Sequence, residues 1–63
     1  MRAYTVCFVK VDVDFFSGEQ AVVDTATAVV AALNRDDARE LAIRILKLPA
    51  EYQWAYTDEG KES

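Results

Sequence analysis

Few residues in this chain are of types that carry out chemistry. Its 63 residues include no His and a single Cys, Cys7. An acid–base pair, an activated nucleophile or a zinc site usually draws on one of these two residue types. We therefore predict no catalytic residue, no metal ligand and no cofactor, and we expect that the protein is not an enzyme.

Cys7 and a pair of aspartates are the remaining candidates for a reactive or metal-binding site. Cys7 lies between Val6 and Phe8. This is not the electropositive, exposed setting that activates a thiol, so a core cysteine is expected. Asp12 and Asp14 share one face of a predicted strand, but a hard cation needs about six oxygen ligands, usually gathered by a turn. We interpret these two aspartates as part of a solvated face.

Three aromatic residues, Tyr52, Trp54 and Tyr56, alternate along a predicted strand from Glu51 to Thr57. Aromatic rings on a sheet can stack nucleic-acid bases, but such sites also carry a positive groove. Acidic residues surround these rings instead. Packing beneath a helix is favoured for them, because the alternate face of the strand would make a poor core. The other alternative is that the rings join an exposed apolar patch.

Composition limits the class of protein and its partners. The chain is 52% hydrophobic and 29% charged, which is typical of a folded globular domain. Its net charge of −4 disfavours direct binding to nucleic acid, because that binding depends on cationic side chains. Charged residues interrupt the N-terminal apolar run and no stretch is long enough to span a bilayer. We expect a cytoplasmic protein with no membrane partner.

Two strands and a turn are predicted in the first half of the chain. From Tyr4 to Phe16 the chain is rich in β-branched and aromatic residues and follows a period-two pattern, which indicates a strand. A two-residue turn at Ser17-Gly18 would place Cys7 opposite Ala28. Residues 20–33 are compatible with a helix or a strand, and their many β-branched side chains favour a strand.

A helix is predicted from Arg35 to Leu48. Asn34 is a suitable N-cap, Asp36 and Asp37 place negative charge in the first turn, and Pro49 ends the helix. The apolar residues at helical spacing form one stripe: Ala38, Leu41, Ala42, Ile45 and Leu48.

The predicted fold class is α+β, with the order strand, strand, helix, strand (ββαβ) in a single domain of residues 1–57. A right-handed crossover from the second strand to the third favours a three-stranded sheet in the spatial order 2-1-3, with the helix packed on one face. Residues 58–63 are expected to form a disordered acidic tail.

The faces of the first strand lead to a prediction about binding. Its odd-numbered positions are almost wholly apolar, so we expect them beneath the helix, with Leu41 and Ile45 buried against them. The other face would then be open and would expose an apolar patch that binds a partner. The residues predicted for this patch are Tyr4, Val6, Phe8, Val29 and Trp54.

The run Val29–Ala42, VVAALNRDDARELA, resembles the strand-to-helix junction of many small phage and prophage proteins. Those proteins often share the ββαβ layout. They are frequently host-interaction factors, including inhibitors of defence systems. The resemblance implies a protein partner and no particular activity.

These observations favour a non-enzymatic protein-interaction domain, of the phage type that inhibits or modulates a host complex. Two alternatives stay open. One is a self-associating homodimer, in which a second copy completes the core. The other is an acidic nucleic-acid mimic that blocks a DNA-binding enzyme.

Overall fold

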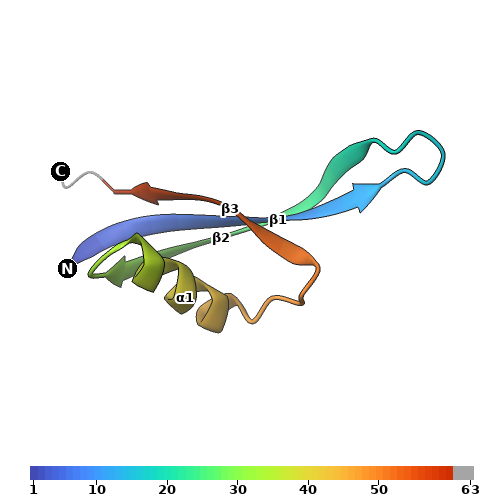
Figure 1. Ribbon diagram of the computed structural model, residues 1–63. Helices are drawn as coiled ribbons and strands as arrows, with labels where there is room; N and C mark the ends of the chain where they lie inside the picture. Colours follow the sequence, from blue (N-terminus) through green and yellow to red (C-terminus); the bar gives the residue numbers. More distant parts are fainter. Residues whose placement is uncertain (61–63) are drawn as a thin grey trace.

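The computed structural model describes residues 1–60, which form strand β1 (Arg2–Val13), strand β2 (Gln20–Ala32), helix α1 (Arg35–Leu46) and strand β3 (Tyr52–Glu59). The α+β class and the ββαβ order are confirmed, and the sheet has the order β2-β1-β3 (Figure 1). β1 is antiparallel to both of its neighbours. β2 and β3 therefore run in the same direction, as the crossover through α1 requires.

The N-terminus of α1 has the cap that its sequence predicts, whereas the residue that closes its C-terminus was not predicted. The side chain of Asn34 accepts a hydrogen bond of 2.9 Å from the backbone N–H of Asp37, and acidic residues occupy the first turn. Lys47 takes a left-handed conformation, and its N–H donates to the Ile43 carbonyl at 3.0 Å. The helix ends at Leu46, before its predicted end, because a left-handed residue closes it ahead of Pro49.

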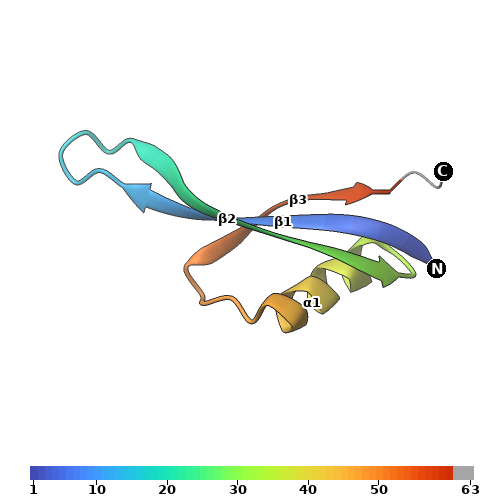
Figure 2. The ribbon, with the colours of Figure 1, turned by 180° about the vertical axis from the view of Figure 1, so that it is seen from behind.

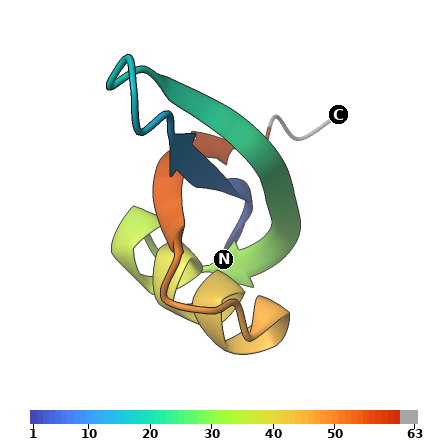
Figure 3. The same cartoon turned by 90° about the vertical axis from the view of Figure 1, so that its right-hand side faces the viewer.

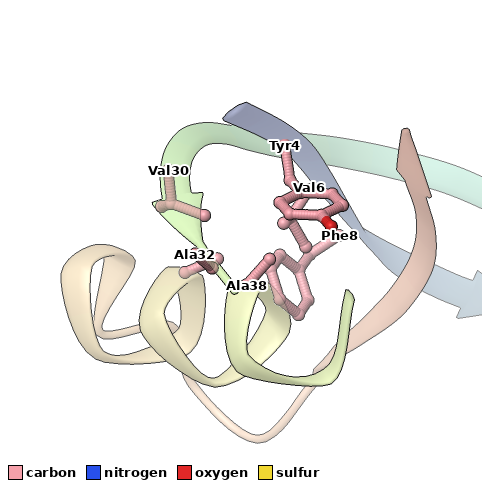
Figure 4. Close-up of a cluster of buried hydrophobic side chains, with 7 residues drawn as sticks. Tyr4, Val6, Phe8, Val30, Ala32 and Ala38 are labelled. Atoms are coloured by element: carbon pink, nitrogen blue, oxygen red, sulfur yellow. The ribbon is translucent and has the colours of Figure 1, made fainter. Parts of the chain in front are cut away.

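The core lies between α1 and the part of the sheet formed by the start of β1 and the end of β2 (Figure 4). Small residues, Ala38 and Ala42, are the fully buried positions of the helix, and they allow its backbone to approach the sheet closely. Leu41 is only half-buried, and Ile45 is 62% exposed. The predicted burial was therefore wrong for Ile45, because the face of α1 that packs on the sheet is centred on Ala38 and Ala42.

The even-numbered face of β1 packs beneath α1, which corrects the predicted odd-numbered core. At about 1.5 Å per residue, the 12 residues of α1 span about 18 Å, whereas the 12 residues of β1 extend over about 40 Å. The helix therefore covers only the part of β1 in which the even positions are large and apolar, Tyr4, Val6 and Phe8. Polar residues on the same face, such as Asp12, come after the covered part.

The turn between β1 and β2 is longer than predicted. The chain turns through residues 15–18, and the Asp14 N–H donates to the Glu19 carbonyl at 2.8 Å. Gly18 has a φ of 72°, a left-handed conformation that glycine adopts without a steric penalty. A loop of four residues brings together the same faces as a loop of two, but it moves each partner on β2 by two positions along the strand.

A β-bulge in β2 changes the pairing beyond the turn. Val23 has no partner on β1, and the register shifts at this point. An extra residue on one strand turns the following side chains to the opposite face. With the four-residue loop alone, Cys7 would lie opposite Ala26. The extra residue moves its partner to Thr27, whereas Ala28 was predicted.

A second bulge, in β3, divides the three aromatic residues between the two faces. Cys7 pairs with Tyr56, whereas the next residue of β1 pairs with Trp54, so Ala55 is the extra residue. Tyr52 and Trp54 therefore share the face that α1 covers, and Tyr56 lies on the open face. The predicted helix side is therefore correct for Tyr52 and Trp54, and the open side, which was the alternative, is correct for Tyr56.

The C-terminal segment is more ordered than predicted as far as residue 60. Asp58 and Glu59 belong to β3, and the Gly60 N–H donates to the Ala3 carbonyl at 2.7 Å. The rest of the predicted disordered tail, residues 61–63, lies outside the described residues.

Candidate interaction surface

The residues singled out for chemistry do not form a reactive site in the part of the chain that the structure describes. Within residues 1–60, no three His, Cys, Asp or Glu side chains lie close enough together to hold a metal ion. Cys7 is buried, and Asp12 and Asp14 are exposed, as predicted for all three. No helix of these residues is long and apolar enough to cross a bilayer.

The far half of the β1–β2 hairpin projects from the rest of the molecule. β3 pairs with β1 only as far as Lys10, so beyond that residue β2 is the single neighbour of β1. Residues 11–24, which we call the arm, form a two-stranded ribbon that extends past α1 (Figures 1 and 2). The radius of gyration is 13.5 Å, compared with about 10.6 Å for a compact chain of this length.

Two phenylalanines occupy the end of the arm. Phe15 is 97% exposed and Phe16 is 99% exposed, and their rings meet edge to face with centroids 6.4 Å apart. The carboxylate of Asp14 accepts a hydrogen bond of 2.9 Å from the Phe16 N–H. Hydrogen bonds from the backbone N–H groups of Phe16 and Ser17 lower the pKa of Asp14. The tip is therefore a defined turn that holds both rings in solvent.

Polar contacts connect the base of the arm to β3 and the loop before it. Lys10 Nζ lies 3.0 Å from a Glu51 carboxylate oxygen, and the hydrogen bond to Glu51 raises the pKa of Lys10. The Tyr52 hydroxyl donates to the Asp24 carboxylate. This hydrogen bond lowers the pKa of Asp24 and raises the pKa of Tyr52. These contacts hold the arm at the point where it leaves the three-stranded sheet.

Within residues 1–60, no helix covers the face of the sheet away from α1 (Figure 3), and exposed apolar residues lie on this face as well. Val29, opposite Thr5, is 71% exposed on this face, as predicted. Tyr56 lies on the same face next to Cys7, and the charge and hydrogen bonding of Cys7 raise the pKa of Tyr56. Cys7 is thus buried on the open side of the sheet.

Trp54 lies on the helix side, at the margin of the core. Its ring is 47% exposed, and the Arg39 guanidinium carbon lies 5.5 Å from the ring centroid, a cation–π contact. The indole N–H donates to the Thr57 hydroxyl at 2.8 Å. A shallow depression beside Trp54 is lined by Ile43 and Leu48. The predicted patch required Trp54 to lie next to Val29. The two residues instead lie on opposite faces of the sheet, so this part of the prediction was wrong.

Three of the five predicted partner-binding residues lie in the core. Tyr4, Val6 and Phe8 are buried beneath α1, and their predicted place on an open face was wrong. The alternation of β1 is apolar on both faces at this end, so either face could have met the helix. Buried side chains cannot form a docking surface, so a surface role for these three residues is not retained.

The most exposed apolar residues, Phe15 and Phe16, were missed as a pair. A sequence signal for them exists, because two adjacent residues of a strand point to opposite faces and cannot both enter one core. Their position directly before Ser17-Gly18 places them in the turn. The predicted strand, which extends to Phe16, instead placed Phe15 on its apolar odd-numbered face.

Comparisons of the chain with protein-family models, with curated proteins and with solved structures find no match.

Proposed function

We propose that this chain is a non-enzymatic protein-interaction domain that binds a partner protein through the arm. The observation that carries this proposal is the pair of exposed rings, Phe15 and Phe16, on a projection that contributes nothing to the core. Burying a large apolar side chain in a partner gains about 1.5–3 kcal/mol. Contiguous exposed apolar groups on a small domain are typical of interaction sites.

The total surface of the molecule supports the same proposal. Its accessible area is 4901 Å², about 800 Å² more than the roughly 4,100 Å² expected for a folded monomer of 7.1 kDa. The residues of the arm are mostly exposed, and a standard protein–protein interface buries about 800 Å² on each partner.

The kind of partner follows from the resemblance of Val29–Ala42 to phage and prophage proteins. We propose a protein of a host complex as the partner, with the domain acting as its inhibitor or modulator.

A homodimer is the second candidate function. It is favoured by the exposed side chains of Val29 and Tyr56 on the open face of the sheet, which a second copy of the chain could cover. In that case the solution mass would be twice that of the chain, and Val29→Glu would return it to the monomer value.

Site-specific photo-crosslinking tests the arm directly. A photo-reactive phenylalanine analogue replaces Phe16 in one protein and Ile45, exposed on α1, in a matched control. In a lysate of the source cell, we expect a discrete protein adduct from position 16 and none of that mass from position 45. Equal adducts from both positions, or none from position 16, would contradict the proposal.

A further inference from the structure

The two faces of the arm carry opposite kinds of side chain. Residues directly opposite each other on paired strands share a face, as do residues two apart on one strand. The register therefore collects four carboxylates on one face: Asp12, Asp14, Glu19 and Asp24. The other face presents valines: Val11, Val13 and Val22.

The net charge of the protein is located in the arm. Residues 11–24 contain four acidic side chains and no Lys or Arg, whereas the rest of the chain contains seven acidic and seven basic side chains. The arm thus has a charge of −4 and the remainder has a charge of zero. Its single basic neighbour at the base, Lys10, is paired with Glu51.

The location of the negative charge in the arm decides which kind of molecule is suited to bind it. A second copy of the chain would bring another charge of −4 against the arm, and like charges at an interface oppose association. An anionic bilayer surface would repel the carboxylates in the same way. The complementary partner is a protein whose groove has cationic walls and an apolar or aromatic floor.

Resting on the proposed function, we propose that the arm occupies a partner groove of the kind that binds single-stranded nucleic acid. Such grooves combine Lys and Arg side chains, which follow the phosphates, with aromatic side chains on which bases stack. The arm offers the same two features, because its carboxylates form one face and the rings of Phe15 and Phe16 lie at its end. The domain would then exclude nucleic acid from the groove.

Competition by polyanions tests the inference, with the position-16 crosslinking protein as the reporter. Heparin and single-stranded oligothymidine are added before irradiation, and neutral dextran serves as the control. We expect both polyanions to suppress the adduct by about tenfold or more when they are present in excess, because they would occupy the same cationic groove, and dextran to leave it unchanged.

Two double variants test whether the adduct yield depends on the charge of the arm or on the charge of the whole chain. Asp12→Asn/Glu19→Gln and Glu40→Gln/Asp58→Asn each remove two negative charges, the first pair from the arm and the second from the remainder. These four side chains form no ion pair within residues 1–60. We expect the first variant to lower the adduct yield by about tenfold and the second to leave it within about twofold.

The outcomes separate this inference from the proposed function. Adducts from position 16 that resist both polyanions would overturn the nucleic-acid groove and leave the interaction domain intact. An equal effect of the two charge variants, or an adduct composed of two copies of this chain, would also overturn it. A complete absence of adducts from position 16 would overturn both proposals.

Discussion

At the scale of single residues, position along the β1–β2 hairpin decides what an aromatic side chain does. Phe8 is buried beneath α1, whereas Phe15, predicted on the same strand, lies in the turn after β1 and is exposed to solvent at the tip of the arm. The first ring stabilises the fold, and the second is free to contact another molecule. The two phenylalanines therefore provide a matched pair for mutation.

Phe8→Ala should lower the free energy of unfolding by about 3–5 kcal/mol, because it removes a buried ring and leaves a cavity. Phe15→Ala should change it by less than about 0.5 kcal/mol. Urea unfolding followed by circular dichroism measures both. Since the first loss equals most of the stability of so small a domain, Phe8→Leu is a milder variant that should still unfold at a lower urea concentration. Equal effects at positions 8 and 15 would contradict this account of the core.

Asp14 makes the tip of the arm sensitive to acid. Its pKa is lowered from 3.8 by hydrogen bonds from the backbone N–H groups of Phe16 and Ser17. A lowered pKa in the folded state stabilises the turn at pH values above 3.8, and this contribution is lost as the pH falls through the folded pKa. In NMR titrations we expect the Asp14 carboxyl to titrate at a lower pH in the folded chain than in urea. Coincident titration curves would show that the turn does not bind the carboxylate.

At the scale of elements, α1 depends on its caps because it is short. Twelve residues give a helix that is marginal in isolation, so its end contacts contribute to the stability of the domain. The hydrogen bond from the Asp37 N–H to Asn34 is the contact at its N-terminus.

Asn34→Ala should lower the free energy of unfolding by about 1 kcal/mol, because the N-terminal N–H groups of α1 lose their side-chain acceptor. Asn34→Asp keeps an acceptor and should remain within about 0.5 kcal/mol of the parent. Thermal unfolding of the two variants side by side measures the difference. If Asn34→Asp is destabilised as much as Asn34→Ala, the cap is not responsible.

At the scale of the whole molecule, the arm and the rest of the described chain, residues 1–10 and 25–60, have separate roles. We call the second part the body. All buried apolar residues belong to the body, and the arm contains none of them. The body therefore has its own core, and the arm adds the charge and the exposed rings.

A shortened chain tests this separation. Replacing residues 12–21 with Asn-Gly joins Val11 to Val22, which already face each other, by a turn that suits antiparallel strands. The free energy of unfolding should change by less than about 1 kcal/mol, because exposed loop regions tolerate deletion. The radius of gyration from solution scattering should fall from near 13.5 Å toward the value of about 10.1 Å for a compact chain of the shortened length. Unfolding of the shortened chain would show that the body needs the arm.

Several features follow from the sequence alone, because they depend on local chemistry. The period-two alternation of residues 4–16, the cap at Asn34 and the end of the helix before Pro49 each act within a few residues. Together with the right-handed crossover, they predict the ββαβ order and the sheet order 2-1-3. The concentration of acidic residues in the arm is also visible in the sequence once the arm is defined.

The tertiary structure alone decided which side chains are buried and which are exposed. Both faces of β1 are apolar near its start, so alternation could not select the face that meets α1; the short helix selected it by covering only Tyr4, Val6 and Phe8. The bulges at Val23 and Ala55 then reset the pairing of both neighbours. A bulge depends on the fit between strands rather than on a local residue pattern, so the surface that remained open, including the arm, appears only in the assembled sheet.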